Sequence, residues 1–188
     1  MKDPQVENIN ILKISGTEIT ETADKVAVEE PLEIQLAYST PTGRMLKNIA
    51  VTMRTPGNDE ELAAGFLFTE GVVKDKEAIL EIKRPHTDDN RVLVTLKENV
   101  QPVLANTARN FYSTSSCGVC GKASIEAIRI VSPYINAKDT ISIKASLLYG
   151  LQDAVKAQQQ VFEETGGIHA SALFDADGKF MMLREDVG

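Results

Sequence analysis

The sequence contains no tryptophan, only two histidines and only two cysteines among its 188 residues. Aromatic residues make up 5% of the chain, so a hydrophobic core is expected to consist mainly of aliphatic side chains. No apolar run approaches the roughly 20 residues that a transmembrane helix needs. Residues 1–19 lack the basic start and the apolar centre of a signal peptide. These absences predict a cytoplasmic protein with no membrane partner.

The overall composition is that of a globular protein. Hydrophobic residues make up 43% and charged residues 25%, and the length suits one large domain or two small ones. The formal net charge is −7. A nucleic-acid-binding protein needs a basic face, so no nucleic-acid partner is expected.

The first half of the chain predicts a β-rich part. Residues 1–29 show only a weak pattern and are expected to be peripheral. Residues 31–38 alternate between apolar and polar side chains, which is the period of a half-buried strand. A cluster of turn-forming residues at 39–43 and a second apolar segment at 46–53 then predict a β-hairpin.

A helix is predicted to follow this hairpin. Asn58 suits the N-cap position, and Glu61 lies three residues later, as in a capping box. Such a helix places four apolar residues on one face: Leu62, Ala63, Phe66 and Leu67. Gly71 is expected to end this segment. Further strands are predicted at 79–82 and 91–96.

Residues 99–116 show little regular spacing of apolar side chains, which predicts a loop and a domain boundary. The predicted organisation is therefore a β-rich N-terminal part with one capped helix over 1–105 and an α/β domain over 106–188. Helices are predicted at 122–131 and, with the clearest amphipathic spacing in the chain, at 146–163.

The end of the chain predicts a second hairpin. Gly166 and Gly167 suit the end of the long helix, where a left-handed residue is common. Strands are expected at 168–174 and 179–184, around a turn at 175–178. The sequence stops just after the second strand, and we interpret it as truncated at its C-terminus.

The two cysteines lie at Cys117 and Cys120, three positions apart. Two thiols at this spacing can form a disulfide, provide half of a metal site, or pass a sulfur atom between partners. The predicted helix after them and the nearby Lys122 both favour the thiolate form. A cytoplasmic location argues against a permanent disulfide.

The metal alternative needs more ligands than the cysteine pair supplies. Zinc is held by four ligands in structural sites, and His86 and His169 are the only histidines in the chain. Zinc deaminases carry a ligand histidine with a catalytic glutamate and then Pro-Cys-x-x-Cys. Here Ser116 stands in place of the proline and no His-x-Glu precedes it, so deaminase chemistry is excluded.

Three further segments could bind an anion. The first is the segment 54–57, where Arg54 and Gly57 precede a predicted helix whose first amides could bind an anion. The alternative is an ordinary loop that enters the helix, with a surface arginine and a capping asparagine. The glycine pair before His169 leaves room for a ligand, but a lone strand histidine is more often a packing residue. Residues 184–186 are either a solvated strand end or the rim of a site.

Taken together, four blocks of sequence resemble the formate dehydrogenase accessory sulfurtransferase family (FdhD-type). The blocks are residues 53–67, 115–122, 165–170 and 173–188. They are long, in order and spread over most of the chain, whereas the two cysteines alone would carry no such resemblance.

The resemblance implies a function and a fold. Members of this family take persulfide sulfur from a cysteine desulfurase and deliver it to the molybdenum bis-guanine-dinucleotide cofactor, as formate dehydrogenase activity requires. The implied fold is a cytidine-deaminase-like layered α/β domain with a smaller β-rich part, assembled as a homodimer. The implied partners are the desulfurase and formate dehydrogenase, with the molybdenum cofactor as bound substrate and no metal on the protein itself.

Carried onto this chain, the resemblance makes Cys117 the persulfide-bearing residue and Cys120 its partner in the same loop. The residues expected to line the cofactor site are Arg54, Thr55, Gly57, Gly166, Gly167, His169, Arg184 and Asp186. The alternative is a non-catalytic module that shields or inserts the cofactor, in which the cysteine pair holds a structural zinc ion.

Overall fold

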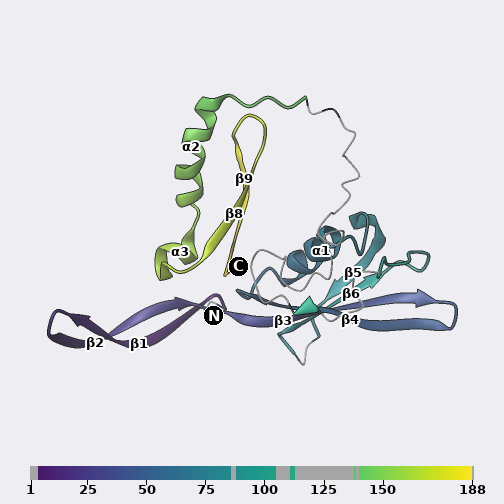
Figure 1. Cartoon of the computed structure of the whole chain (residues 1–188), viewed down its shortest axis with the longest axis horizontal. Coiled ribbons are helices and arrows are strands. Elements are labelled where there is room, and N and C mark those ends of the chain that lie inside the picture. The colour runs from purple at the N-terminus through teal and green to yellow at the C-terminus, as the bar shows by residue number, and fades with distance from the viewer. Residues whose placement is uncertain (1–3, 86–87, 105–110, 113–137, 139, 188) are drawn as a thin grey trace. The chain divides into compact units, whose positions relative to one another are not determined.

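The computed structural model describes residues 4–85, 88–104, 111–112, 138 and 140–187 (Figure 1). The strands are β1 (Val6–Ser15), β2 (Glu18–Ala27), β3 (Glu30–Thr40), β4 (Gly43–Arg54), β5 (Ile79–Lys83), β6 (Arg91–Leu96), β7 (Phe111–Tyr112), β8 (His169–Phe174) and β9 (Phe180–Asp186). The helices are α1 (Asp59–Thr69), α2 (Ala145–Lys156) and α3 (Gln160–Thr165), with a short 3₁₀ helix η1 (Lys76–Ala78). The predicted mixed α/β class is confirmed.

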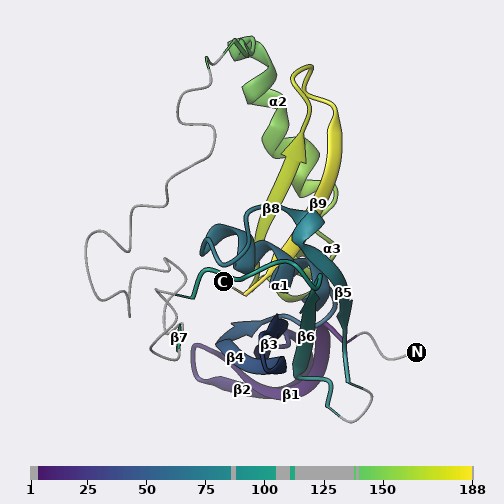
Figure 2. The same cartoon turned by 90° about the vertical axis from the view of Figure 1, so that its right-hand side faces the viewer.

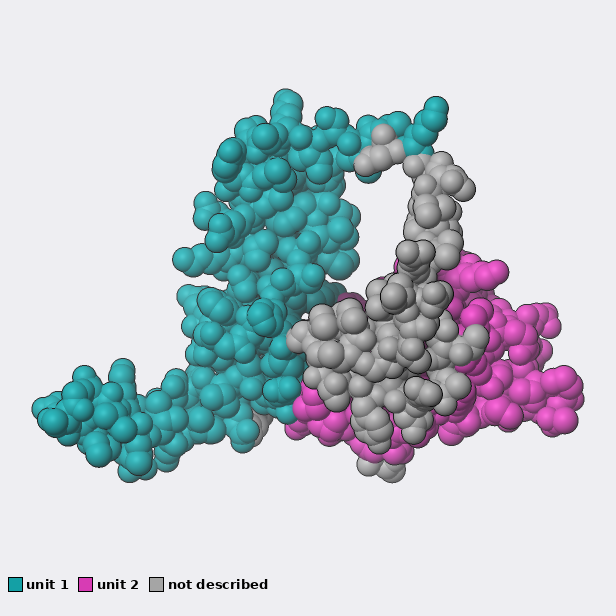
Figure 3. Space-filling model, in the orientation of Figure 1, with its two compact units in different colours: residues 1–29, 54–57, 137–188 teal, residues 30–53, 58–136 magenta. Residues whose placement is uncertain are grey.

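The chain divides into two compact units (Figure 3). The first unit comprises residues 1–29, 54–57 and 137–188, and the second comprises residues 30–53 and 58–136. The domain boundary predicted at residue 105 lies outside the described residues.

The second unit is built on a five-stranded sheet with the strand order β5-β6-β3-β4-β7. β3 and β4 are neighbours joined by the turn at 41–42, which confirms the predicted hairpin. β6 covers residues 91–96 as predicted and pairs in parallel with β3 and antiparallel with β5. Alternation in the sequence therefore located the central strands correctly.

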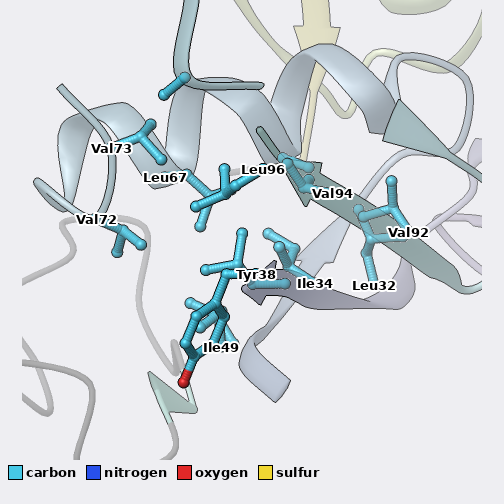
Figure 4. Close-up of a cluster of buried hydrophobic side chains, with 14 residues drawn as sticks. Leu32, Ile34, Tyr38, Ile49, Leu67, Val72, Val73, Val92, Val94 and Leu96 are labelled. Atoms are coloured by element: carbon cyan, nitrogen blue, oxygen red, sulfur yellow. The ribbon is translucent and has the colours of Figure 1, made fainter. Parts of the chain in front are cut away.

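The core of this unit is aliphatic, as the scarcity of aromatic residues predicts. Leu32, Ile34 and Leu36 lie on one face of β3, and their side chains are fully buried. The parallel register pairs Ile34 with Val92 and Leu36 with Val94, so both strands present branched side chains to the same core. Figure 4 shows these residues converging with side chains from α1 and the segment after it.

α1 begins where the sequence predicts, but without the predicted capping box. The Asn58 carbonyl accepts a hydrogen bond from the Leu62 amide at 3.0 Å, while its side chain makes no capping bond. Asn58 is the N-cap residue as predicted, but its backbone is not in the extended conformation that usually aims an N-cap side chain at the helix, so the predicted capping bond from its side chain was wrong. Gly71 has a φ of 68° just after the helix, as expected of a glycine that ends it.

In the first unit, β1 and β2 form a long antiparallel hairpin that the sequence interpretation missed. Its pairing runs without a break from Val6 opposite Ala27 to Ser15 opposite Glu18. Most of its side chains are exposed, which weakens the hydrophobic pattern from which strands are recognised. Only its base is anchored, where Val6 joins a small apolar cluster with Val161 and Ile168.

The single helix predicted at 146–163 is in fact two helices, α2 and α3. The Gln158 amide bonds to the Val155 carbonyl, three residues back, so the α-helical ladder stops after Lys156. A new helix starts because the Glu185 carboxylate accepts hydrogen bonds from the Val161 and Phe162 amides, at 3.0 and 2.8 Å. The helix break is therefore set by a contact from β9.

The second predicted hairpin is confirmed as β8 and β9, which pair antiparallel around the turn at 175–178. Figures 1 and 2 both show α2 running alongside this hairpin. Gly166 adopts the predicted left-handed conformation at the end of α3, with a φ of 67°.

Within the described part of the chain, no helix is both long and apolar enough to cross a membrane.

Candidate functional site

The predicted sulfur-handling residues, Cys117 and Cys120, lie outside the described residues, as do His86 and the helix predicted at 122–131. Their roles stay predictions. The remaining predicted site residues all belong to the first unit, in the segment 54–57, at the end of α3 and on the β8–β9 hairpin.

The first two residues of the segment 54–57 are buried, so Arg54 is not the surface arginine of the alternative interpretation, whereas Gly57 is exposed. The exposed fraction is 1% for Arg54 and 5% for Thr55. Gly57 has a φ of 137°, and a β-carbon placed there would lie 3.3 Å from Nε2 of Gln5. A side chain at position 57 would thus be strained both by its backbone and by its neighbour.

The Thr55 hydroxyl is the unusual group in this segment. Its Oγ1 is buried, and no described residue offers it a hydrogen-bond partner. A buried hydroxyl without a partner costs roughly 1–3 kcal/mol, so such groups are rare in folded proteins.

A long-range hydrogen bond joins this segment to β9. The Thr55 backbone amide donates to Oδ1 of Asp186 at 2.7 Å, across 131 residues of sequence. Two of the predicted site segments are thereby brought together in one place.

The register of the β8–β9 hairpin adds two further predicted residues to this place. His169 lies directly opposite Asp186, and Arg184 lies opposite Ser171. Residues opposite each other and two apart share a face of a β-ribbon, so His169, Arg184 and Asp186 belong to the same face. His169 is exposed and Arg184 is half-buried, with its Nη1 donating to the Leu183 carbonyl at 2.7 Å.

The two remaining predicted residues, Gly166 and Gly167, form the connection from α3 to β8. Both are exposed, and the Gly167 amide lies 3.4 Å from the Thr165 hydroxyl. Among the described residues, neither glycine is hydrogen-bonded to Thr55 or Asp186, so they adjoin these residues only through the start of β8.

Sequence reasoning missed the part played by Glu185. Residues 184–186 were interpreted as a solvated end or a rim, yet both carboxylates of this stretch accept backbone hydrogen bonds from distant elements. The available signal was the alternation of a strand, which sends the neighbours Glu185 and Asp186 to opposite faces. One carboxylate therefore bonds α3 and the other bonds the segment 54–57.

The polar groups in and around the segment 54–57 and the β8–β9 hairpin are of kinds that often contact anions. Two arginines, a histidine and a hydroxyl are the groups that commonly bind phosphate oxygens. Among the described residues, no group of three or more His, Cys, Asp or Glu side chains could hold a metal ion. In class, this is a mixed α/β protein with polar side chains gathered at the end of the β8–β9 hairpin.

Comparison with known proteins gives the family. Residues 27–188 match the model of the FdhD/NarQ family. A sulfur carrier protein FdhD from Mycolicibacterium paratuberculosis is 44% identical over 172 residues, which cover 88% of this chain and 60% of the relative. The sulfur carrier protein FdhD of Mycobacterium tuberculosis is 40% identical over 185 residues, covering 93% of this chain and 64% of the relative. The chain belongs to the FdhD/NarQ family.

A solved structure supports the fold. The crystal structure of a candidate formate dehydrogenase accessory protein from Desulfotalea psychrophila matches with a TM-score of 0.69 and 22% sequence identity. The match covers 98% of this chain and 64% of that one. The chain thus spans about 60% to 64% of the length of these relatives.

Proposed function

We propose that this protein is a sulfurtransferase that carries persulfide sulfur from a cysteine desulfurase to the molybdenum bis-guanine-dinucleotide cofactor, for use by formate dehydrogenase. The family match over residues 27–188 carries this proposal, because it includes both cysteines. Relatives at 40% to 44% identity are named sulfur carrier proteins, which supports the same chemistry here.

The first step is the loading of Cys117. Its thiolate attacks the terminal sulfur of the persulfide on the desulfurase, so that a new S–S bond forms on Cys117. The S–S bond of the donor breaks, and the desulfurase cysteine leaves as a thiolate. No electrons are gained or lost overall, because one persulfide replaces another.

The second step is the release of the carried sulfur. The Cys120 thiolate attacks the inner sulfur of the Cys117 persulfide and forms a Cys117–Cys120 disulfide. The outer sulfur leaves as hydrosulfide and becomes a ligand of the molybdenum substrate. A dithiol reductant then supplies two electrons and two protons to restore both thiols.

The cofactor would be held by the polar groups of the first unit. Arg54, Thr55 and Arg184 can donate hydrogen bonds to the diphosphate oxygens of a guanine dinucleotide. The exposed His169 on the same hairpin can donate as well, while Gly57, Gly166 and Gly167 leave room for a close approach. The hydrogen bond from the Thr55 amide to Asp186 and the hairpin register, which bring several of these residues together, support this part of the proposal.

Mass spectrometry tests the carrier role. After incubation with a cysteine desulfurase and free cysteine, we expect the protein to gain one sulfur atom that reduction removes. Cys117→Ala should gain none, whereas Cys120→Ala should load and then hold its sulfur for longer. A wild-type protein that stays unmodified under conditions in which the desulfurase carries a persulfide would refute the proposal.

A second candidate function is a non-catalytic module that shields or inserts the finished cofactor, with the cysteine pair in a structural zinc site. Metal analysis of protein purified under reducing conditions separates the two functions. Stoichiometric zinc that is lost in Cys117→Ser would favour this module, and absence of zinc together with a persulfide would favour the carrier.

The wider setting is part of the same proposal. The protein would act in the cytoplasm as a homodimer, and its partners would be a cysteine desulfurase and formate dehydrogenase. The deaminase-like layering of the α/β domain also stays a prediction. Size-exclusion chromatography with light scattering would measure the oligomeric state.

A further inference from the structure

The hairpin of β1 and β2 carries apolar side chains that the rest of the described chain leaves exposed. Among the described residues it forms a sheet of two strands, so the outer edge of β1 has no ladder partner. Ile14 lies directly opposite Ile19, and Leu12 lies two residues from Ile14 on the same face. These three side chains are between 65% and 70% exposed. An open strand edge beside exposed apolar side chains is a surface on which another strand can pair.

The base of this hairpin is tied to the rest of the first unit. Val6 packs with Val161 and Ile168, and Nζ of Lys25 lies 2.6 Å from Oε2 of Glu164 in α3. Beyond Val6, every side chain of β1 is exposed or half-buried. The remainder of β1 is therefore available to a partner.

The sequence of β1 is self-complementary when two copies of the strand pair antiparallel. A two-fold axis at Asn10 places Glu7 of each copy opposite Lys13 of the other. The same register places Ile9 of each copy opposite Ile11 of the other. Opposite charges and branched apolar side chains directly across an antiparallel ladder stabilise it. Because of the symmetry, each favourable pair occurs twice.

The neighbouring registers lose this match. With the axis one residue nearer the tip of the hairpin, at Ile11, Lys13 would lie opposite Ile9 of the other copy. With the axis one residue nearer the base, at Ile9, Glu7 would lie opposite Ile11. In both cases a charge meets an apolar side chain and the attraction between opposite charges is lost. Charge complementarity thus selects one register and one partner, a second copy of this chain.

The register at Asn10 also gives the exposed tip of the hairpin a neighbour. It places Ile14 of each copy opposite Val6 of the other, and Val6 belongs to the apolar cluster at the base. Ile14 would then lie between Ile19 of its own hairpin and Val6 of the second copy. Apolar side chains that are exposed in one copy are thereby brought to an apolar part of the other, which favours association.

We propose that the β1–β2 hairpin is a dimerisation arm: β1 pairs antiparallel with β1 of a second copy, about an axis at Asn10, to form a four-stranded sheet. This inference rests on the homodimer of the proposed function and assigns its interface. The match to the family model begins at residue 27, where the hairpin ends, so the family assignment does not supply this interface.

Cysteine cross-linking of the full chain tests the register. With Cys117 and Cys120 replaced by serine, Asn10→Cys puts the two new thiols directly opposite each other, within reach of a disulfide. Asn8→Cys is the matched control, because it is exposed on the same face but its two copies would lie roughly 13 Å apart along the strands. With glutathione disulfide as oxidant, Asn10→Cys should give a covalent dimer on a non-reducing gel and Asn8→Cys should not.

Charge reversal tests the pairing of Glu7 with Lys13. Glu7→Lys and Lys13→Glu should each weaken dimerisation about tenfold in sedimentation velocity, because each sets like charges opposite one another twice. The double variant exchanges the two charges, so its affinity should return to within about threefold of wild type. Glu21→Lys changes the net charge as Glu7→Lys does, but on β2, the outer strand of the proposed sheet, and should dimerise as wild type.

Four results would overturn this inference. They are a wild-type chain that stays monomeric over the micromolar range, equal cross-linking of Asn10→Cys and Asn8→Cys, a dimer that both charge reversals leave unchanged, and a double variant as weak as the single ones. Cross-linking relies on small changes at exposed positions, so it decides even where a charge reversal disturbs the hairpin.

Sulfur loading of Cys117 separates this inference from the carrier role. A monomeric chain that still gains one sulfur from the desulfurase would refute the arm and leave the carrier role standing. A chain that dimerises through the arm but gains no sulfur would refute the carrier role and leave the arm standing.

Discussion

The ion pair between Arg84 and Asp59 should contribute more stability than any comparable surface pair in the second unit. Arg84 Nη1 lies 3.0 Å from Oδ2 of Asp59, in the first turn of α1. The exposed fraction of the side chain is 1% for Asp59 and 41% for Arg84. Replacing Arg84 with alanine would leave a buried carboxylate without this cation.

The geometry sets the expected size of the effect. Two unit charges at this separation attract by roughly 1.4 kcal/mol at the dielectric constant of water and by roughly 5.5 kcal/mol at an effective value of 20. The exposure of Arg84 shifts the pair toward the lower value, while the burial of Asp59 shifts it upward. We therefore expect Arg84→Ala to lower the free energy of unfolding by about 2 kcal/mol.

Arg91→Ala is the matched control. Arg91 Nε lies 3.1 Å from Oε2 of Glu33, and its side chain is 38% exposed, close to the value for Arg84. The carboxylate of Glu33, however, is 22% exposed, so this pair should contribute less than about 1 kcal/mol. Arg91 Nη2 also lies 3.5 Å from Oδ2 of Asp88, which is 38% exposed, so the control removes two exposed pairs where Arg84→Ala removes one pair with a buried carboxylate.

The assay is urea denaturation followed by far-UV circular dichroism, with and without added salt. Salt should shrink the cost of Arg91→Ala more than that of Arg84→Ala, since buried pairs are screened less. In Arg84→Ala combined with Asp59→Asn, part of the lost stability should return, because the buried negative charge that Arg84 faced is also removed. Equal costs for Arg84→Ala and Arg91→Ala would refute the reasoning.

Two further predictions concern α3 and the core. Glu185→Ala should destabilise the start of α3 by about 1–2 kcal/mol, since two amides lose their acceptor. Faster hydrogen exchange at Val161 and Phe162 would show this loss. Glu163→Ala, at an exposed position of the same helix, should leave that exchange unchanged. Leu36→Ala should cost roughly 2–5 kcal/mol of unfolding free energy in chemical denaturation, because Leu36 is fully buried. Leu80→Ala, at a side chain that is mostly exposed, should cost less than about 0.5 kcal/mol, and a similar loss in both variants would contradict the assignment of the core.

Local sequence patterns determined much of this protein. The alternation in 31–38 and 91–96 located β3 and β6, because a half-buried strand needs one apolar face. Gly166 marked the end of α3, because its left-handed backbone strains other residues. The role of the predicted site residues stays a prediction; in the structure, Thr55 is hydrogen-bonded to Asp186, and Asp186 lies opposite His169 in the hairpin.

Tertiary structure decided what depends on residues far apart. The helix predicted at 146–163 breaks because Glu185 supplies acceptors for amides that a continuous helix would have bonded internally. The β1–β2 hairpin escaped recognition because strand pairing stabilises it with little burial of its side chains.

The join between Thr55 and Asp186 spans 131 residues, and periodicity carries information over only a few turns or strand positions. The sequence identifies which side chains could bind or react, because these properties depend on residue type. Which carboxylate meets which amide is fixed only when the folded chain brings distant segments within hydrogen-bonding distance.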